Sequence, residues 1–241
     1  MFRDVCPRCR RPRESCLCPA EPAMILRTKI VLLMHPKEWR RERCGTGRLT
    51  CLNIADAELL PGIAFDGHPR VRQLIDDPGN FPVLLYPGKG SIDLSESKRT
   101  GPHPADGHSA VDELPAVARL RMAASGRRIT AFLVDATWAC SKAVLRESPG
   151  LLALPRLMFT PRTPSRWIIK RQPSPLCLST LETVHELLCA LESAGLEDYP
   201  DKDRLLEVFA RMQEYQIERA VRGSLKQVMP ISSRNKGRAS P

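Results

Sequence analysis

The stretch "LVDATWACSK" at residues 133–142 places a carboxylate, a hydroxyl and a large aromatic ring at the end of an apolar run. A carboxylate there can act as a general base, and an aromatic face can stack on a planar ligand. Asp135, Thr137 and Trp138 are therefore candidate catalytic residues. The alternatives are structural: Asp135 or Thr137 would cap the helix predicted over 138–147, and Trp138 would pack in the core.

Four cysteines in "CPRCRRPRESCLC" form a second candidate site. Their spacing is C-x2-C-x6-C-x-C, and the residues are Cys6, Cys9, Cys16 and Cys18. Four thiolates this close in sequence can surround one zinc ion tetrahedrally, which leaves no open position for catalysis. Arg10, Arg11 and Arg13 would offset the negative charge. We predict a structural zinc; the alternative is a reduced, flexible arm.

Three apolar runs must position the first site: 28–34, 81–86 and 129–134. Each is nearly continuous, as in strands that are covered on both faces of a parallel sheet. Polar or turn residues follow each run, namely His35, Pro87 with Gly88, and Asp135. Ligands of parallel α/β sheets bind at the carboxyl ends of strands, so these residues are expected at one ligand-binding edge.

Helical patterns separate and follow these runs, at 46–58, 113–124, 138–147 and 179–195. Ser179 and Glu182 fit a capping box at the start of the fourth helix. Asp201 is expected to cap a last helix, whose apolar stripe is Leu205, Leu206, Phe209, Met212 and Ile217. Residues 87–112 are predicted to form a long loop. We therefore expect an α/β fold with a mostly parallel sheet and flanking helices.

Composition narrows the class of protein. The 241 residues carry a net charge of +10, which favours a polyanionic partner such as nucleic acid. No apolar run is long enough to span a membrane, and the charged start is unlike a secretory signal, so we expect a cytoplasmic protein without a membrane partner. The motifs of dinucleotide oxidoreductases, P-loop NTPases, α/β-hydrolases and zinc proteases are absent.

Eight short motifs then follow one another in an order that resembles the DTW-domain family, the tRNA-uridine aminocarboxypropyltransferases. They are "CPRCRRPRESCLC", "LLMHP", "TGRL", "LYPG", "DATW", "SPGLLALPR", "SRWIIKRQP" and "LSTLET". The resemblance implies transfer of the 3-amino-3-carboxypropyl group from S-adenosylmethionine to N3 of a uridine in tRNA, with release of methylthioadenosine. It also implies a SPOUT-like domain with a C-terminal trefoil knot.

The expected organisation is a four-cysteine zinc segment at 1–22, a catalytic domain at 23–221 and a basic, disordered tail at 222–241. Within the domain, the expected donor-binding residues are His35, Arg48, Pro87, Gly88, Ser179 and Thr180. The expected RNA-binding residues are Lys142, Arg166, Trp167, Lys170 and Arg171. Structural alternatives stand beside these roles: a buried histidine for His35, a helix cap for Ser179 and Thr180, and a solvated charge for Lys142.

The implied reaction breaks the bond between sulfur and the γ-carbon, so the acceptor must lie in line with that carbon. Uridine N3 must lose a proton to attack, and Asp135 is the candidate base. The sequence leaves open the same chemistry on ribosomal RNA, a non-catalytic zinc-containing RNA-binding protein, and a methyltransferase. It does not fix the oligomeric state, for which a monomer is favoured.

Overall fold

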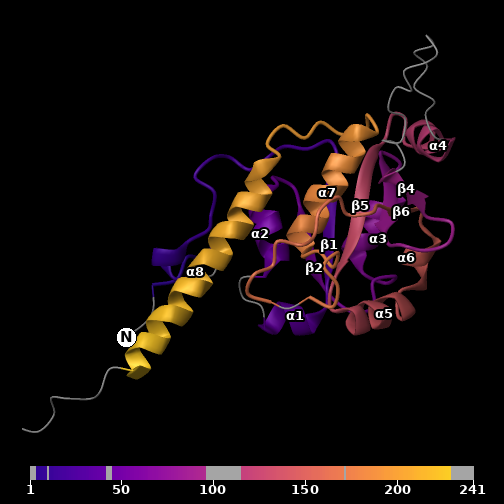
Figure 1. The fold of residues 1–241 in the computed structure, drawn as a ribbon. Helices are drawn as coiled ribbons and strands as arrows, with labels where there is room; N and C mark the ends of the chain where they lie inside the picture. Colours follow the sequence, from indigo (N-terminus) through magenta and orange to yellow (C-terminus); the bar gives the residue numbers. More distant parts are fainter. Residues whose placement is uncertain (1–3, 10, 42–44, 96–114, 171, 229–241) are drawn as a thin grey trace, which may run out of the picture.

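A computed structural model describes residues 4–9, 11–41, 45–95, 115–170 and 172–228. Its centre is a 6-stranded sheet in the order β2-β1-β5-β3-β6-β4, in which every pairing is parallel (Figure 1). The strands are β1 (Lys29–Met34), β2 (Glu58–Pro61), β3 (Asn80–Leu85), β4 (Ile92–Asp93), β5 (Arg128–Asp135) and β6 (Arg156–Met158). The predicted α/β class is confirmed; the trefoil knot stays a prediction.

Helices cover both faces of the sheet (Figure 1). They are α1 (Pro36–Arg41), α2 (Thr46–Asn53), α3 (Pro69–Asp76), α4 (Pro115–Ala123), α5 (Trp138–Arg146), α6 (Pro149–Ala153), α7 (Thr180–Ser193) and α8 (Asp203–Val228), with a short 3-10 turn at Arg13–Ser15. None of the helices in these described ranges is long and apolar enough to cross a bilayer.

The two faces of the sheet bury different helices because strand residues alternate in direction. On one face, Ile30 and Leu32 of β1 pack in a cluster with residues of α2, α4, α7 and α8. On the other face, Val31 and Leu33 pack with residues of α3, α5 and α6. Burial on both faces explains the continuous apolar runs of β1 and β5.

Three expectations about these elements need correction. The helix predicted over 46–58 ends at Asn53, and residues 58–61 form β2 instead. The last helix begins at Asp203 rather than directly after Asp201, and Ile217 is 39% exposed, so it lies outside the buried stripe. Helix α8 continues to Val228, so the boundary predicted at 221–222 falls inside a helix. Residues 229–241 and residues 96–112 of the predicted loop lie outside the described residues.

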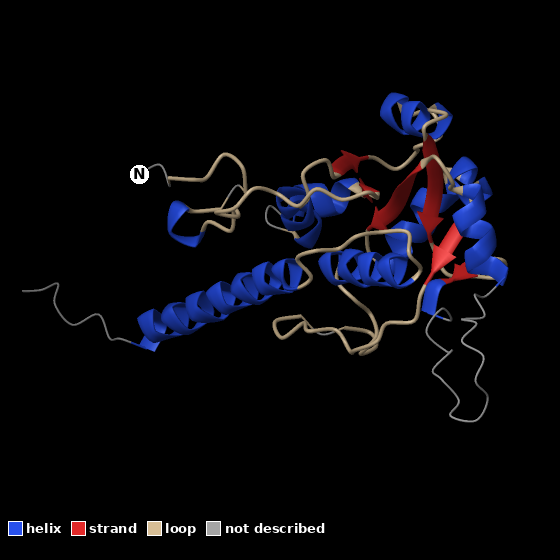
Figure 2. Ribbon diagram, turned by 90° about the horizontal axis from the view of Figure 1, so that it is seen from above, coloured by secondary structure: helices blue, strands red, loops and turns tan. Residues whose placement is uncertain are grey.

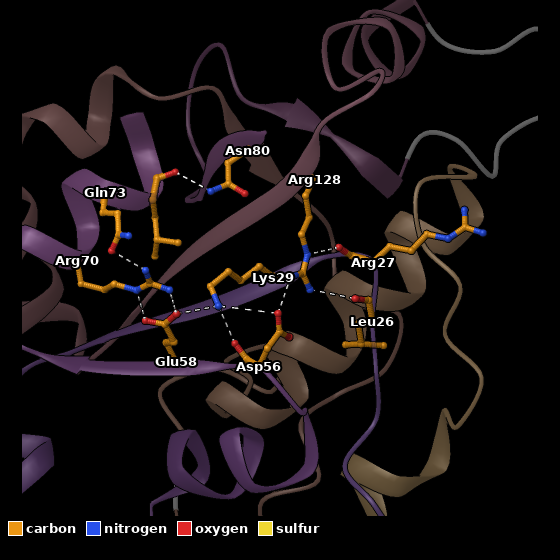
Figure 3. A network of polar contacts seen from close by, with 10 residues as sticks. Leu26, Arg27, Lys29, Asp56, Glu58, Arg70, Gln73, Asn80 and Arg128 are labelled. Atoms are coloured by element: carbon orange, nitrogen blue, oxygen red, sulfur yellow. Dashed lines mark hydrogen bonds and ion pairs between the residues drawn. The ribbon is translucent and has the colours of Figure 1, made fainter. Parts of the chain in front are cut away.

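A polar network closes the amino ends of β1, β2 and β5 (Figure 3). Lys29 is 8% exposed, and its Nζ lies 2.8 Å from Oε1 of Glu58. Arg70 donates to the same carboxylate through Nε at 2.9 Å. These partners, the Arg70 hydrogen bond foremost, lower the pKa of Glu58 to about 2. The network lies at the amino edge of the sheet, opposite the carboxyl ends of β1 and β5, so its role is to stabilise the fold.

We therefore expect the free energy of unfolding to fall as pH is lowered through Glu58's titration range. The folded pKa lies below the usual value near 4.5, so the stabilisation is complete above that value and is lost as pH falls toward 2. Glu58→Gln should remove roughly 1–3 kcal/mol at neutral pH. Urea unfolding at pH 7, 5 and 3 would test this, because the difference between wild type and variant should shrink on acidification.

Glu218→Gln is a matched control for this measurement. Glu218 pairs with Arg222 on the exposed face of α8, where both side chains are more than half exposed. Exposed pairs of this kind contribute little to stability. An effect of Glu58→Gln no larger than that of Glu218→Gln would contradict the stabilising role of the network around Lys29.

Candidate active site at the carboxyl edge of the sheet

The parallel register places the ends of β1 and β5 side by side. Met34 is the register partner of Asp135, and the amide of His35 donates to the carbonyl oxygen of Asp135 at 3.1 Å. The central strands therefore deliver the two predicted residues to the same edge of the sheet. This is the arrangement expected for ligand binding in parallel α/β proteins.

The carboxylate of Asp135 is held between the first turns of two helices. Thr180 begins α7, and its Oγ1 donates to Oδ1 of Asp135 at 2.7 Å. Gly47 lies in the first turn of α2, where a Cβ would collide with Oδ2 of Asp135 and approach Cε of Met34 to 3.2 Å. The Asp135 carboxylate therefore occupies space that would be filled by the side chain of any residue other than glycine at position 47.

Two of the predicted site residues, Thr137 and His35, have local structural roles. Thr137, and not Asp135, caps α5, because its hydroxyl accepts from the amide of Cys140 at 3.4 Å. The capping alternative for Asp135 is therefore wrong. His35 is 6% exposed, and its Nδ1 accepts from the amide of Lys37 at 3.1 Å, which fixes the start of α1. The side chain of Trp138 lies outside the described part of the structure.

A first cavity of about 320 Å³ opens at the ends of β3, β5 and β6. We call it the large cavity. Its lining is mainly apolar, and none of the described residues lining it carries a charge: Leu85, Tyr86, Pro87, Leu133, Val134, Ala136, Ser141, Leu157, Met158, Phe159, Pro161, Leu176, Cys177, Leu178, Thr180 and Thr183. A cavity of this size and polarity suits a drug-sized ligand with a flat, apolar part.

A second cavity of about 150 Å³ lies on the Asp135 side. We call it the small cavity, and its lining residues are Met34, Glu38, Gly45, Thr46, Asp135, Trp167, Ile169, Lys170, Met212 and Gln216. Thr180 lines the large cavity and donates to Asp135, which lines the small one. The Thr180–Asp135 hydrogen bond therefore lies between the two cavities.

The loop at 165–170 is fixed by two buried side chains. Glu182 of α7 is 3% exposed; its Oε1 accepts from the amide of Arg166 at 2.6 Å and its Oε2 from the hydroxyl of Ser165 at 2.9 Å. Gln213 of α8 accepts from the amide of Ile168 at 2.6 Å and donates to the carbonyl of Arg166 at 3.0 Å. The wall of the small cavity is thus built by α7 and α8 together.

Of the predicted donor-binding residues, Pro87 and Thr180 line the large cavity. Gly88 is exposed beside Pro87 in a left-handed conformation, φ 151°, and Ser179 is the buried cap of α7 in the predicted capping box. His35 and Arg48 line neither cavity. The Arg48 guanidinium lies 3.8 Å from the centre of the Trp39 ring.

Of the predicted RNA-binding residues, Trp167 and Lys170 line the small cavity. The Trp167 ring packs edge-on against Phe209 at 4.8 Å, and Nζ of Lys170 lies 5.1 Å from the centre of the Trp167 ring. Arg166 and Lys142 are exposed and line neither cavity, while Arg171 lies outside the described residues. The structure therefore joins Trp167 and Lys170 to Asp135 but leaves Lys142 on the surface of α5.

Sequence reasoning missed several residues of this edge: Gly47, Glu38, Met212 and Gln216. Gly47 belongs to the motif "TGRL", but the motif gives no sign that its missing side chain makes room for Asp135. Cys51 of α2 also carries a potentially reactive side chain near Asp135, but its thiol is a poor nucleophile. Burial, and then the Asp135 charge, raises the pKa of its thiol to about 12.

Gly47→Ala should lower catalytic turnover while the chain still folds. The new methyl group must displace the Asp135 carboxylate, and a misplacement of about 1 Å can cost roughly 10²-fold in rate. Single-turnover kinetics and the thermal midpoint should be measured together. Gly67→Ala is the matched control, because a Cβ at Gly67 has no neighbour within 4 Å. Equal rates in the two variants would show that the close approach at Gly47 has no catalytic consequence.

The four N-terminal cysteines converge as predicted. Their sulfur atoms all lie within 4.8 Å of one another, with Cys6 and Cys18 at 3.6 Å and Cys9 and Cys16 at 3.7 Å. Four sulfurs around a zinc ion at about 2.3 Å would be about 3.8 Å apart, so the cluster fits such an ion. The amide of Cys6 donates to the carbonyl of Arg11 at 2.8 Å and closes the loop that carries Cys9.

The cysteine segment is attached to α8, which projects beyond the sheet (Figure 2). Arg11 is 4% exposed, and its guanidinium lies 5.3 Å from the centre of the Tyr215 ring. The Tyr215 hydroxyl donates to Glu14 at 3.5 Å. Arg11 therefore fastens the segment to the helix, whereas Arg13 pairs with Asp4 at the surface and Arg10 lies outside the described residues.

Fold and site together define an α/β protein whose ligands meet at the carboxyl edge of a parallel sheet. The DTW domain matches residues 3–217, and the chain belongs to the DTW-domain family. It is 30% identical over 199 residues to tRNA-uridine aminocarboxypropyltransferase 2 of Drosophila melanogaster, covering 79% of this chain and 68% of that protein.

Two further relatives carry related names. tRNA-uridine aminocarboxypropyltransferase 2 of Mus musculus is 27% identical, over 79% of this chain and 57% of the mouse protein. tRNA-uridine aminocarboxypropyltransferase A of Arabidopsis thaliana is 25% identical, over 89% of this chain and 81% of the plant protein. The chain thus spans little more than half of the mouse protein. No solved structure matches the chain.

Proposed function

We propose that this protein transfers the 3-amino-3-carboxypropyl group of S-adenosylmethionine to N3 of a uridine in tRNA. The observation that carries the proposal is the Asp135 carboxylate, which is fixed between two cavities at the carboxyl edge of the sheet. The family and the names of its curated relatives support the same reaction.

The large cavity suits the donor. Its apolar walls, with Tyr86, Leu133 and Phe159 among them, match an adenine ring, and the hydroxyls of Thr180 and Thr183 offer hydrogen bonds to a polar arm. The absence of charge among its described lining residues leaves the sulfonium without a tight counter-ion, so the positive sulfur keeps its reactivity toward a nucleophile. His35 and Arg48 do not line this cavity, so we propose that they contribute to donor binding only indirectly.

Asp135 is the proposed base. Its carboxylate takes the proton from uridine N3, and the freed electron pair of N3 forms the bond to the γ-carbon. The bond from the γ-carbon to sulfur breaks, and its electrons return to sulfur, which leaves as a neutral thioether that needs no acid. The proton on Asp135 then passes to water. Thr180 holds one carboxylate oxygen during these steps, so it is a positioning residue.

The proposed metal at Cys6, Cys9, Cys16 and Cys18 is a structural zinc, because all four ligand positions come from the chain. It would supply order to a short segment that has little core of its own. The exposed Arg166 and Lys170 are the proposed phosphate contacts of the tRNA near the site.

A double-label experiment tests the function. Wild-type protein is incubated with bulk tRNA, or in a parallel reaction with ribosomal RNA, and with S-adenosylmethionine labelled either in the methyl group or in the aminocarboxypropyl group. We expect only the second label to appear in tRNA. Transfer of the methyl label would identify a methyltransferase. Transfer to ribosomal RNA alone would show that the acceptor is ribosomal RNA and not tRNA. Binding without any transfer would indicate a non-catalytic RNA-binding protein.

A further inference from the structure

We infer that the small cavity is the binding pocket for the acceptor base and that it selects uracil over cytosine. The inference rests on the proposed function, because that function requires a pyrimidine next to Asp135. It adds the location of the base, the residues that hold it and the chemical basis of the choice.

Size separates the two cavities. A single water needs roughly 10–15 Å³ of comparable volume, so about 150 Å³ has room for one small planar ring. The donor, with adenine, ribose and an amino-acid arm, exceeds that volume and fits the large cavity instead. A base that enters the small cavity must therefore leave its stack in the RNA, as bases do in enzymes that modify them.

The depth of the small cavity suits a flipped base. Met34 and Met212 are 1% and 2% exposed, so they form its buried end, while Lys170 and Gln216 are exposed at its mouth. Thioether groups are soft and polarizable, and they pack well against aromatic rings. The exposed Lys170 at the mouth lies where the phosphate backbone next to a flipped nucleotide would pass.

The polar groups of the cavity match the edge of uracil. Uracil presents an N3–H donor between two carbonyl oxygens. Asp135 supplies an acceptor, and the hydroxyl of Thr46 supplies a donor. Cytosine keeps the O2 carbonyl but presents a bare N3 acceptor in place of the N3–H and an amino group in place of the O4 carbonyl, so its N3 would face the Asp135 carboxylate without a hydrogen. The group that removes the N3 proton would thus also select the base.

Glu38 is a second carboxylate on the same cavity wall. It lies in the first turn of α1, and its side chain is half-buried. Asp135 is the better candidate for contact with N3 because Thr180 and Gly47 fix its carboxylate beside the large cavity. Glu38 supplies the control that separates a specific contact from the general negative charge of the cavity.

Methionine methyl groups report on both cavities without any reaction. In protein labelled with ¹³C at the methionine methyl groups, Met158 lines the large cavity, and Met34 and Met212 line the small one. S-adenosylmethionine alone should shift Met158. Uridine 5′-monophosphate should shift Met34 and Met212, and cytidine 5′-monophosphate should bind at least about tenfold more weakly, as expected for loss of a hydrogen bond to a charged group. Asp135→Asn should abolish this preference, and Glu38→Gln should retain it.

Each outcome bears on one proposal. If S-adenosylmethionine shifts Met158 but neither nucleotide shifts Met34 or Met212, the acceptor pocket is wrong and the proposed donor site stands. Equal binding of the two nucleotides would overturn the selection by Asp135. A Met158 that does not respond to S-adenosylmethionine would count against the proposed function itself.

A kinetic arm uses tRNA. Lys170→Met should raise the tRNA concentration for half-maximal transfer by about 10-fold or more, with unchanged affinity for S-adenosylmethionine. Arg146→Met is the matched control, because Arg146 is exposed on α5 and lines neither cavity. Identical tRNA dependence in the two variants would contradict the placement of the acceptor at this mouth.

Discussion

Asp135→Asn should reduce transfer to tRNA by about 10²–10⁴-fold and leave the affinity for S-adenosylmethionine unchanged. Asparagine keeps the shape of the side chain, and its oxygen can still accept the hydrogen bond from Thr180. The fold and the large cavity should therefore survive. The amide cannot take a proton from N3, so the chemical step alone is impaired. Single-turnover transfer and equilibrium dialysis of labelled donor measure the two quantities separately.

Glu38→Gln is the matched variant, since it removes the other carboxylate of the small cavity. We expect it to retain turnover within a few-fold. If Glu38→Gln loses activity and Asp135→Asn keeps it, the base is Glu38, and Asp135 serves only to orient ligands. Full activity in both variants would leave the reaction without a carboxylate base and would refute this chemistry.

Cys9→Ser should abolish binding of the proposed structural metal and loosen a defined part of the chain. Cys9 is 2% exposed, and its sulfur lies 3.7 Å from that of Cys16, so a shorter, harder hydroxyl would leave the site incomplete. Wild-type protein should carry about one zinc per chain by elemental analysis and the variant almost none. Hydrogen exchange should rise in residues 4–18 and in the part of α8 around Tyr215, which holds Arg11 and Glu14.

The sheet should keep its protection in Cys9→Ser, because its core clusters contain none of the four clustered cysteines. Cys140→Ser on α5 is the control for loss of a thiol, and it should change neither the zinc content nor the exchange. Unchanged exchange in residues 4–18 of metal-free Cys9→Ser would contradict an ordering role for the metal.

The central strands were predictable because both of their faces are buried. Strands buried on both faces need apolar residues at successive positions, so β1, β3 and β5 appear in the sequence as continuous apolar runs. The end of each run then shows which residues lie at the carboxyl edge of the sheet. The capping box of α7 was predictable because its two partners, Ser179 and Glu182, are close in sequence. The cysteine cluster was predictable for the same reason.

The short strands and the cavities were not predictable, because they depend on distant neighbours. β6 has three residues, and it becomes a strand by pairing with β3 and β4 on either side. The position of the Asp135 carboxylate depends on contacts with Gly47 and Thr180, which lie far apart in the sequence. Glu182 was predicted as a capping residue, yet it also holds the loop at 165–170, a contact that no local pattern encodes.

The position of β5 between β1 and β3 has a consequence for synthesis of the protein. A chain emerging from the ribosome carries β1 and β3 before the strand that joins them exists, so both present unpaired edges until Arg128–Asp135 inserts. Thr180, whose hydroxyl holds the Asp135 carboxylate, emerges later still. Products of premature termination before α7 would therefore lack a working site and would be prone to aggregate. A complete site forms only in chains that have been made past the last strand of the sheet and into α7.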